Sequence, residues 1–176
     1  SPADLDLELD VAENGETFAA NAELKARAYA AASGQIALAD DSGLEVDALC
    51  GTPGVRSARY GAPDLDDEGR YLYLLSELQS YPVPSKRIAR FRCAISAISP
   101  DGRQCRAEGT CEGLIAQSPT GSNGFGYDPV FFVPNHNATM AQLDAATKNS
   151  LSHRGQALVA VIPLLKSTFP ELNISL

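Results

Sequence analysis

The sequence is poor in positive charge and has no long hydrophobic run. Fourteen Lys and Arg residues face 22 Asp and Glu residues, which gives a formal net charge of -8. A protein with this balance has no field that would attract a nucleic-acid polymer nonspecifically. The apolar run at 157–165 contains Pro163 and falls far short of the roughly 20 residues that span a bilayer. We therefore expect neither a nucleic-acid polymer nor a membrane as partner.

Paired metal-binding cysteines are also missing. The four cysteines form no C-x-x-C pair and the chain has only two histidines, so a zinc site is not expected. Cys105 and Cys111 could share one face of a strand, but six residues would separate their Cα atoms by roughly 20 Å, too far for a disulfide. We expect four reduced, mostly buried thiols: Cys50, Cys93, Cys105 and Cys111.

The composition is that of a compact globular protein. Hydrophobic residues make up 44% and charged residues 20% of the 176 residues, and no repeat or low-complexity tract interrupts the chain. This length suits a single domain over residues 1–176, or two lobes that share one core. The first four residues lack the basic and apolar regions of a signal peptide, which predicts a cytoplasmic location.

The patterning predicts alternating helices and strands. Leu5, Leu7, Leu9 and Val11 alternate with acidic residues, which fits a strand with one solvated face or equally a frayed acidic terminus. The Ala-rich segment 17–32, followed by Gly34, predicts a capped helix. Residues 36–39 predict a buried strand that ends in a polar turn at 40–43, the place where α/β folds bind their ligands.

The second half predicts further elements of both kinds. Acidic residues at 64–67 cap a predicted helix through Leu78, with Tyr71, Leu74, Leu75 and Leu78 forming one apolar stripe. Alternation around residues 89–97 and 105–112, joined by a Pro-Asp-Gly turn, predicts an antiparallel hairpin with Arg90 and Arg92 on its solvated face. A Gly/Asn-rich loop follows at 120–126, and residues 150–166 fit a helix.

Two polar segments could carry chemistry. Asp40 and Asp41, followed by Ser-Gly, could hold a hard cation or activate water, although the same four residues also make an ordinary turn. The segment 121–128 combines flexible glycines with two aromatic rings and a carboxylate, and could either contact a nucleotide or pack as a structural loop.

Cationic groups follow within thirty residues of that loop. Lys148, His153 and Arg154 suit an anion or a base carbonyl. Alternatively, His153 caps a helix and Arg154 is a surface group. Three sparse polar clusters in one small protein favour a nucleotide site.

Together these segments resemble the inosine triphosphate pyrophosphatase family, the bacterial dITP/XTP pyrophosphatases. The resemblance runs from about Glu13 to Leu165 and is carried by ADDSGLEVDAL at 39–49, GTPGVRSARYG at 51–61, GFGYDP at 124–129 with FFVP at 131–134, and SHRGQAL at 152–158. It implies an α/β fold with a long mixed central β-sheet flanked by helices, in two lobes with a substrate cleft between them. It also implies Mg²⁺-dependent hydrolysis of deaminated purine nucleoside triphosphates to the monophosphate and pyrophosphate, by a homodimer.

The resemblance also implies a role for each matching residue. Asp41 would be the catalytic carboxylate and, with Glu13 and its neighbour Asp40, would bind the metal. The implied substrate contacts are Ser42, Asn21 and Lys25, then Phe125, Gly126, Tyr127 and Asp128, and finally Lys148, His153 and Arg154. Asn21 and Lys25 would face the phosphates, and the aromatic residues would stack on the base.

One part of the family pattern has no match. Members begin with a strand and a Ser/Thr-x-Asn-x-x-Lys loop that cradles the triphosphate, and nothing before Glu13 corresponds to it. The chain would thus start roughly 30 residues late for an intact member. Two alternatives stay open. The missing loop would fit a non-catalytic nucleotide-binding or dimeric remnant, and a pyrophosphatase of the related septum-inhibitor family would share the architecture but prefer other nucleotides. The motifs at 124–128 and 152–155 argue against the second.

Overall fold

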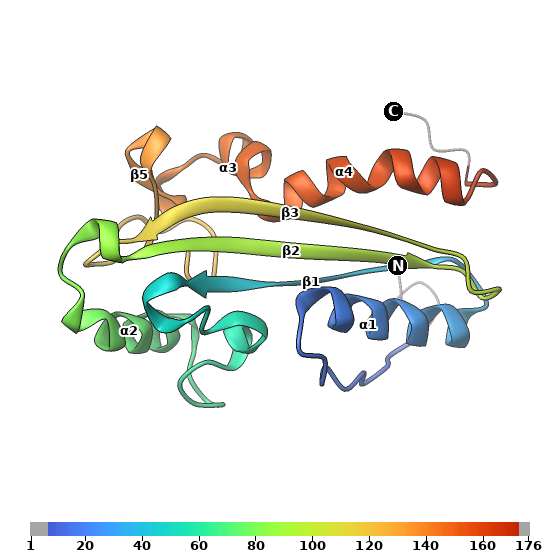
Figure 1. Cartoon of the computed structure of the whole chain (residues 1–176), viewed down its shortest axis with the longest axis horizontal. Helices are drawn as coiled ribbons and strands as arrows, with labels where there is room; N and C mark the ends of the chain where they lie inside the picture. The colour runs from blue at the N-terminus through green and yellow to red at the C-terminus, as the bar shows by residue number, and fades with distance from the viewer. Residues whose placement is uncertain (1–6, 173–176) are drawn as a thin grey trace. The chain divides into compact units, whose positions relative to one another are not determined.

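The computed structural model describes residues 7–172. Its strands form one five-stranded sheet in the order β1-β2-β3-β4-β5, so that each strand lies beside the next one along the chain (Figure 1). The strands are β1 (Ala37–Val46), β2 (Ile88–Ile98), β3 (Gln104–Ile115), β4 (Phe131–Val133) and β5 (Ala138–Thr139), and the helices are α1 (Phe18–Ser33), α2 (Asp67–Glu77), α3 (Ala145–Leu151) and α4 (His153–Thr168). Short 3-10 helices cover Asp47–Leu49, Gly54–Arg59, Leu78–Ser80, Pro84–Lys86, Pro134–His136 and Met140–Gln142.

The predicted α/β fold is confirmed, but the sheet is not mixed. In the described residues, neighbouring strands run antiparallel: Leu114 pairs with Phe132 between β3 and β4, and Val133 pairs with Ala138 between β4 and β5. Tight connections explain the antiparallel pairing of β2 with β3 and of β4 with β5, because a short turn can reverse the chain whereas parallel neighbours need a crossover of a dozen or more residues.

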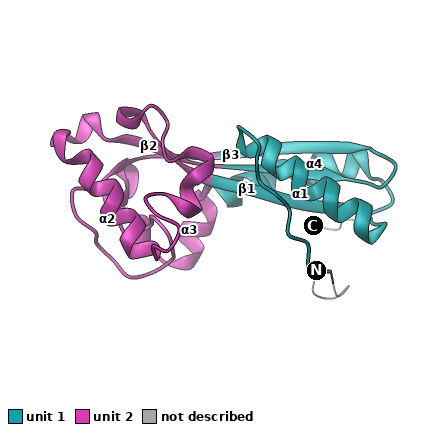
Figure 2. Ribbon diagram, turned by 90° about the horizontal axis from the view of Figure 1, so that it is seen from below, with its two compact units in different colours: residues 1–42, 93–109, 153–176 teal, residues 43–92, 110–152 magenta. Residues whose placement is uncertain are grey.

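The chain divides into two compact units (Figure 2). Unit 1 comprises residues 1–42, 93–109 and 153–176, and unit 2 comprises residues 43–92 and 110–152. The clusters of buried hydrophobic residues described below each lie within one unit. Whether the chain is a single domain or two lobes that share one core stays a prediction. The substrate cleft stays a prediction.

In unit 1 the two long helices cover opposite faces of the strands. Ala26 and Ala30 of α1 pack with Ile98 of β2, whereas Ala157 and Val161 of α4 belong to a separate cluster with alternate β2 and β3 residues such as Cys93, Ile95 and Cys105. The close approach of α4 requires Gly109 on β3, because a Cβ there would lie 2.1 Å from the carbonyl oxygen of His153. This packing fixes the start of α4 against the sheet.

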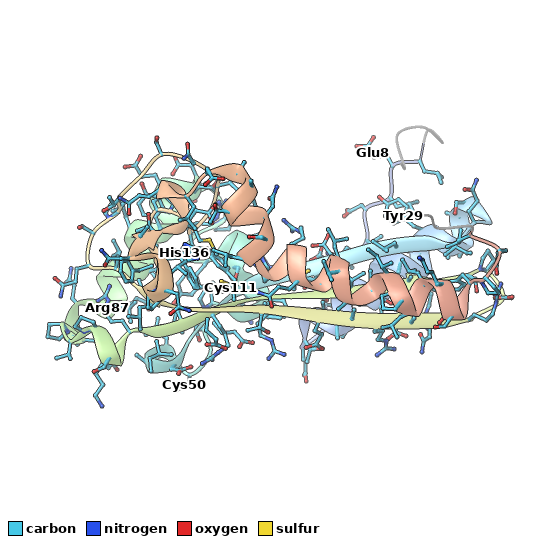
Figure 3. All side chains as sticks on the ribbon, turned by 90° about the horizontal axis from the view of Figure 1, so that it is seen from above. Glu8, Tyr29, Cys50, Arg87, Cys111 and His136 are labelled. Carbon is cyan, nitrogen blue, oxygen red and sulfur yellow. The ribbon has the colours of Figure 1, made fainter. Side chains whose placement is uncertain are left out.

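Unit 2 is organised around one larger cluster. Leu74 and Leu78 of the α2 stripe are fully buried there, as predicted, together with Phe91 and Phe131. Arg87, labelled in Figure 3, is 3% exposed and closes the end of this core. Its guanidinium group donates to the carbonyl oxygens of Leu78, Tyr81, Ile115 and Ala116. A buried cation with carbonyl partners ties three segments of backbone together.

Several predicted boundaries are confirmed by their caps. Thr17 accepts a hydrogen bond from the Ala20 amide at the start of α1, and Gly34 ends the helix in the left-handed conformation at φ 65°. Asp66 caps α2 in the same way. Cys93, Cys105 and Cys111 are buried, whereas Cys50 is exposed; Figure 3 labels Cys50 and Cys111.

Two local predictions are wrong. Residues 7–15 alternate in burial but form no strand, and Leu5 lies outside the described residues. The segment 40–43 is no turn, because β1 continues through it to Val46. The helix predicted from about 150 to 166 is confirmed as α4, which begins at His153 because Ser152 is extended between α3 and α4 with ψ 147°. Over residues 7–172, no helix is long and apolar enough to cross a membrane.

Candidate active site

The first cluster of polar side chains is built on α1. Asn21 and Lys25 stand one helical turn apart and therefore share a face. Both reach the same carboxylate on β1: Asn21 Nδ2 donates to Asp41 Oδ2 at 3.1 Å, and Lys25 Nζ donates to Asp41 Oδ1 at 3.2 Å. Asn21 is fully buried, and its Oδ1 accepts from the Gly15 amide at 2.8 Å, which fixes the orientation of the side chain.

Lys25 connects two carboxylates, which we call the acidic pair, Glu13 and Asp41. Its Nζ lies 3.2 Å from Glu13 Oε1 and 3.2 Å from Asp41 Oδ1. The side chains of Lys25 and Asp41 are only 20% and 11% exposed. Burial raises the pKa of Asp41, against the opposing effects of hydrogen bonds from Asn21 and Lys25. A desolvated carboxylate with directed donors is typical of a functional site.

Asp40 lies on the opposite face of β1, because successive residues of a strand alternate. Its Oδ2 accepts from Arg154 Nε at 3.0 Å and Nη2 at 2.9 Å, and from Ser42 Oγ at 3.1 Å. Cys93 Sγ lies 3.9 Å from the same oxygen, and burial raises the pKa of that thiol. The structure therefore does not bring Asp40 to the acidic pair as the sequence predicted.

The continuation of β1 is the physical reason. A turn at 40–43 would have let both aspartates point to one side, whereas a strand separates them. Accordingly, the described part of the chain has no group of three or more His, Cys, Asp or Glu side chains placed to hold a metal ion. His153 and Arg154 are the first two residues of α4, where His153 is half-buried and Arg154 is exposed.

The second cluster is the loop at 124–128 in unit 2. Asp128 is 5% exposed, and its carboxylate accepts from the Phe125 amide at 2.9 Å and pairs with Lys148. Gly124 has φ 82°, and a Cβ there would lie 2.1 Å from Asp128 Oδ2, so only glycine fits. Lys148 Nζ also stands 4.9 Å from the centroid of the Phe125 ring, a cation–π distance.

The two aromatic residues of this loop have different environments. The Phe125 side chain is 65% exposed, so its ring is open to a ligand. Tyr127 is 5% exposed, its hydroxyl donates to the Ser57 carbonyl oxygen at 2.8 Å, and burial raises its pKa. Of the two rings for which base stacking was predicted, only that of Phe125 is available.

One residue that positions this loop was missed by the sequence analysis. Asp67, the first residue of α2, accepts from the Gly126 amide at 2.7 Å through Oδ2 and pairs with Arg70 through Oδ1. From the sequence alone, Asp67 is expected only as a helix-capping acid. A contact spanning 59 residues leaves no local signal, so only the fold could identify it.

The fold is that of an α/β protein with two clusters of polar side chains. In each cluster a carboxylate, Asp41 or Asp128, pairs with a lysine and accepts a further hydrogen bond from an amide group. Comparison with known proteins makes the class specific. The Ham1 family model matches residues 2–164, and the chain belongs to the Ham1 family.

Relatives and solved structures agree with this assignment. The chain is 49% identical over 162 residues to the dITP/XTP pyrophosphatase of Shouchella clausii, covering 92% of this chain and 81% of the relative. It is 51% identical over 160 residues to that of Desulforamulus reducens, covering 91% and 79%. The Staphylococcus aureus Ham1 protein superposes with a TM-score of 0.87 at 43% identity, covering 94% of this chain and 84% of that one. The resemblance predicted from the motifs is confirmed.

Proposed function

We propose that this chain hydrolyses deaminated purine nucleoside triphosphates, such as ITP, dITP and XTP, to the monophosphate and pyrophosphate. Such an activity would remove these nucleotides from the cytoplasmic pool. Similar proteins named dITP/XTP pyrophosphatases support the proposal. The observation that carries it is the half-buried carboxylate of Asp41, held by Asn21 and Lys25.

Mg²⁺ fits the acidic pair. Mg²⁺ in proteins is usually bound by one or two carboxylates together with substrate phosphates. Glu13 and Asp41 already share one cation, the ammonium group of Lys25, which supports a role for both in holding Mg²⁺. When bound, Mg²⁺ would offset phosphate charge and polarise the phosphoryl oxygens. Asp40 is left out of this proposed set because it faces Arg154 instead.

The residues of the Lys25 cluster, defined as Glu13, Asn21, Lys25 and Asp41, then have distinct tasks. The Asp41 carboxylate would orient the water that attacks the α-phosphorus and accept its proton. Lys25 would donate to phosphate oxygens through a flexible stem, and the fixed Asn21 amide would hold Asp41 in place. Positioning of this kind is the main protein contribution to phosphoryl chemistry.

The base end of the substrate is assigned to other residues. Phe125 would stack on the base, and Lys148 and Asp128 would hold the loop that presents its ring. Arg154, with His153, would donate to the carbonyl at position 6 that inosine and xanthine have and adenine lacks. Once a bound base has withdrawn this donor from water, leaving it unpaired against adenine would cost about 1 to 3 kcal/mol, which gives roughly 10- to 100-fold discrimination.

A product analysis tests the reaction. The chain is incubated with inosine triphosphate and Mg²⁺, and the products are separated by anion exchange, with adenosine triphosphate as the comparison substrate. We expect inosine monophosphate and pyrophosphate in equal amounts, whereas orthophosphate would overturn the assignment. Calorimetric titration in parallel separates an enzyme from a binding protein, because binding without turnover would contradict the proposed hydrolysis. The dimer implied by the family resemblance is tested by light scattering.

A further inference from the structure

The ammonium group of Lys25 stands between the same two carboxylates that are proposed to hold Mg²⁺. It lies 3.2 Å from Glu13 and 3.2 Å from Asp41, at a position where the side chains are largely withdrawn from water. We propose that Lys25 is an internal counter-ion that must leave the acidic pair before a divalent cation can bind there. This inference rests on the proposed function, and it concerns how that site is regulated.

The charges explain why such a counter-ion is needed. Two carboxylates that share one partly desolvated site repel each other, and Lys25 Nζ lies within 3.2 Å of both. Without metal, the Lys25 ammonium neutralises part of this charge and stabilises the folded chain. A divalent cation cannot share the same space with an ammonium group, because like charges at this distance repel strongly.

The side chain of Lys25 is suited to moving away. Lysine carries a compact charge on a flexible four-carbon stem, so the ammonium can swing while the helical backbone of α1 stays fixed. A triphosphate offers the displaced ammonium new anionic partners. Phosphate and metal would therefore bind with positive coupling, and by linkage each would raise the affinity of the other.

The test is metal binding without nucleotide. Mg²⁺ alone is titrated by calorimetry into the wild type, into Lys25→Met and into Lys166→Met, a matched loss of one exposed positive charge in the same unit. Because two partly exposed ion pairs no longer have to be broken, we expect Lys25→Met to bind Mg²⁺ about tenfold more tightly. Lys166→Met should match the wild type. Equal or weaker binding by Lys25→Met would overturn the proposal.

A second measurement does not depend on calorimetric heats. In chelator, Lys25→Met should melt at a lower temperature than the wild type, and added Mg²⁺ should raise its melting temperature more. Lys25→Arg keeps the charge and should bind Mg²⁺ as weakly as the wild type. If Mg²⁺ raised the melting temperature of Lys25→Met no more than that of the wild type, the proposal that Mg²⁺ displaces the Lys25 ammonium group would be refuted.

Asp41→Asn separates failure of this inference from failure of the proposed site. If Asp41→Asn abolishes Mg²⁺ binding while Lys25→Met leaves it unchanged, the acidic pair is the metal site and only the displacement is refuted. If Asp41→Asn binds Mg²⁺ like the wild type, the acidic pair is not the site, and the proposed metal assignment is refuted as well.

Discussion

Replacing Asp41 with Asn is the sharpest test of the candidate site. Asn is nearly equal in volume but carries no charge, so it holds a cation more weakly and cannot accept a proton from water. These contributions act mainly in the transition state, and we expect turnover of inosine triphosphate to fall by a factor of about 10² or more. Substrate affinity should fall less.

The stability of this variant should change little. The Asp41 side chain is 11% exposed, and burial is the largest cause of its raised pKa, so the ionised carboxylate lowers the stability of the folded chain at neutral pH. Asn removes that charge but leaves either Lys25 or Asn21 facing its amide group, at a cost of about 1 kcal/mol. These effects oppose each other, and we expect the free energy of unfolding at pH 7 to stay within about 1 kcal/mol of the wild type.

The pH dependence supplies an internal check. Because the pKa of Asp41 is higher in the folded chain than its ordinary value of 3.8, the folded chain binds the proton more tightly. The stability that the bound proton adds to the folded chain is fully present below pH 3.8 and is lost as the pH rises through the raised pKa of Asp41. Denaturant unfolding without metal should therefore show that the stability of the wild type, relative to Asp41→Asn, falls between pH 3.8 and neutral pH.

Two outcomes would refute this account of Asp41. Near-normal turnover in a folded Asp41→Asn variant would remove the residue from the mechanism. A loss of unfolding free energy of about 3 kcal/mol or more with turnover intact would instead assign it a structural role. Asp40→Asn is the control, since the neighbouring carboxylate lies on the other face of β1 and should keep most of the turnover.

Further substitutions test the other assignments. Arg154→Ala should lower turnover of inosine triphosphate more than turnover of adenosine triphosphate, so that the ratio of the two turnover rates falls roughly tenfold. Asp40→Asn should lower this ratio less. Equal losses on both substrates would assign Arg154 to phosphate binding or to structure. Phe125→Leu should raise KM roughly tenfold with an unchanged melting temperature, because the ring is 65% exposed; an unchanged KM would exclude stacking. Arg87→Met should lower the free energy of unfolding by about 3 kcal/mol or more in thermal denaturation, because four carbonyl groups lose a buried donor; a loss below about 1 kcal/mol would contradict this.

The elements that the sequence predicted well are those with local signals. Thr17 and Gly34 mark the two ends of α1 within a single segment, and the leucine stripe of α2 needs only its own periodicity. The hairpin of β2 and β3 follows from alternation on both sides of a Pro-Asp-Gly turn. In each case the residues that determine the structure are neighbours along the chain.

The candidate site was predicted less completely because its contacts are distant in sequence. The Asp41 carboxylate meets Asn21 and Lys25 across 20 and 16 positions, and Asp40 meets Arg154 across 114. The residue types were predicted, but their grouping depends on which helix covers which face of β1. Tyr127 shows the same limit, since only the fold buries its ring within the hydrophobic cluster of unit 2.

The error at residues 40–43 has a physical lesson for the site. Asp and Gly favour turns when nothing else acts on them, yet here pairing in the sheet and a cation on each face hold the segment in β1. Asp41 is matched by Lys25 of α1, and Asp40 is matched by Arg154 of α4. Adjacent carboxylates in a strand therefore need not form one metal site. They can instead serve two separate charge pairs, and for that reason Asp40→Asn and Asp41→Asn should produce different defects, although the residues are neighbours of identical type.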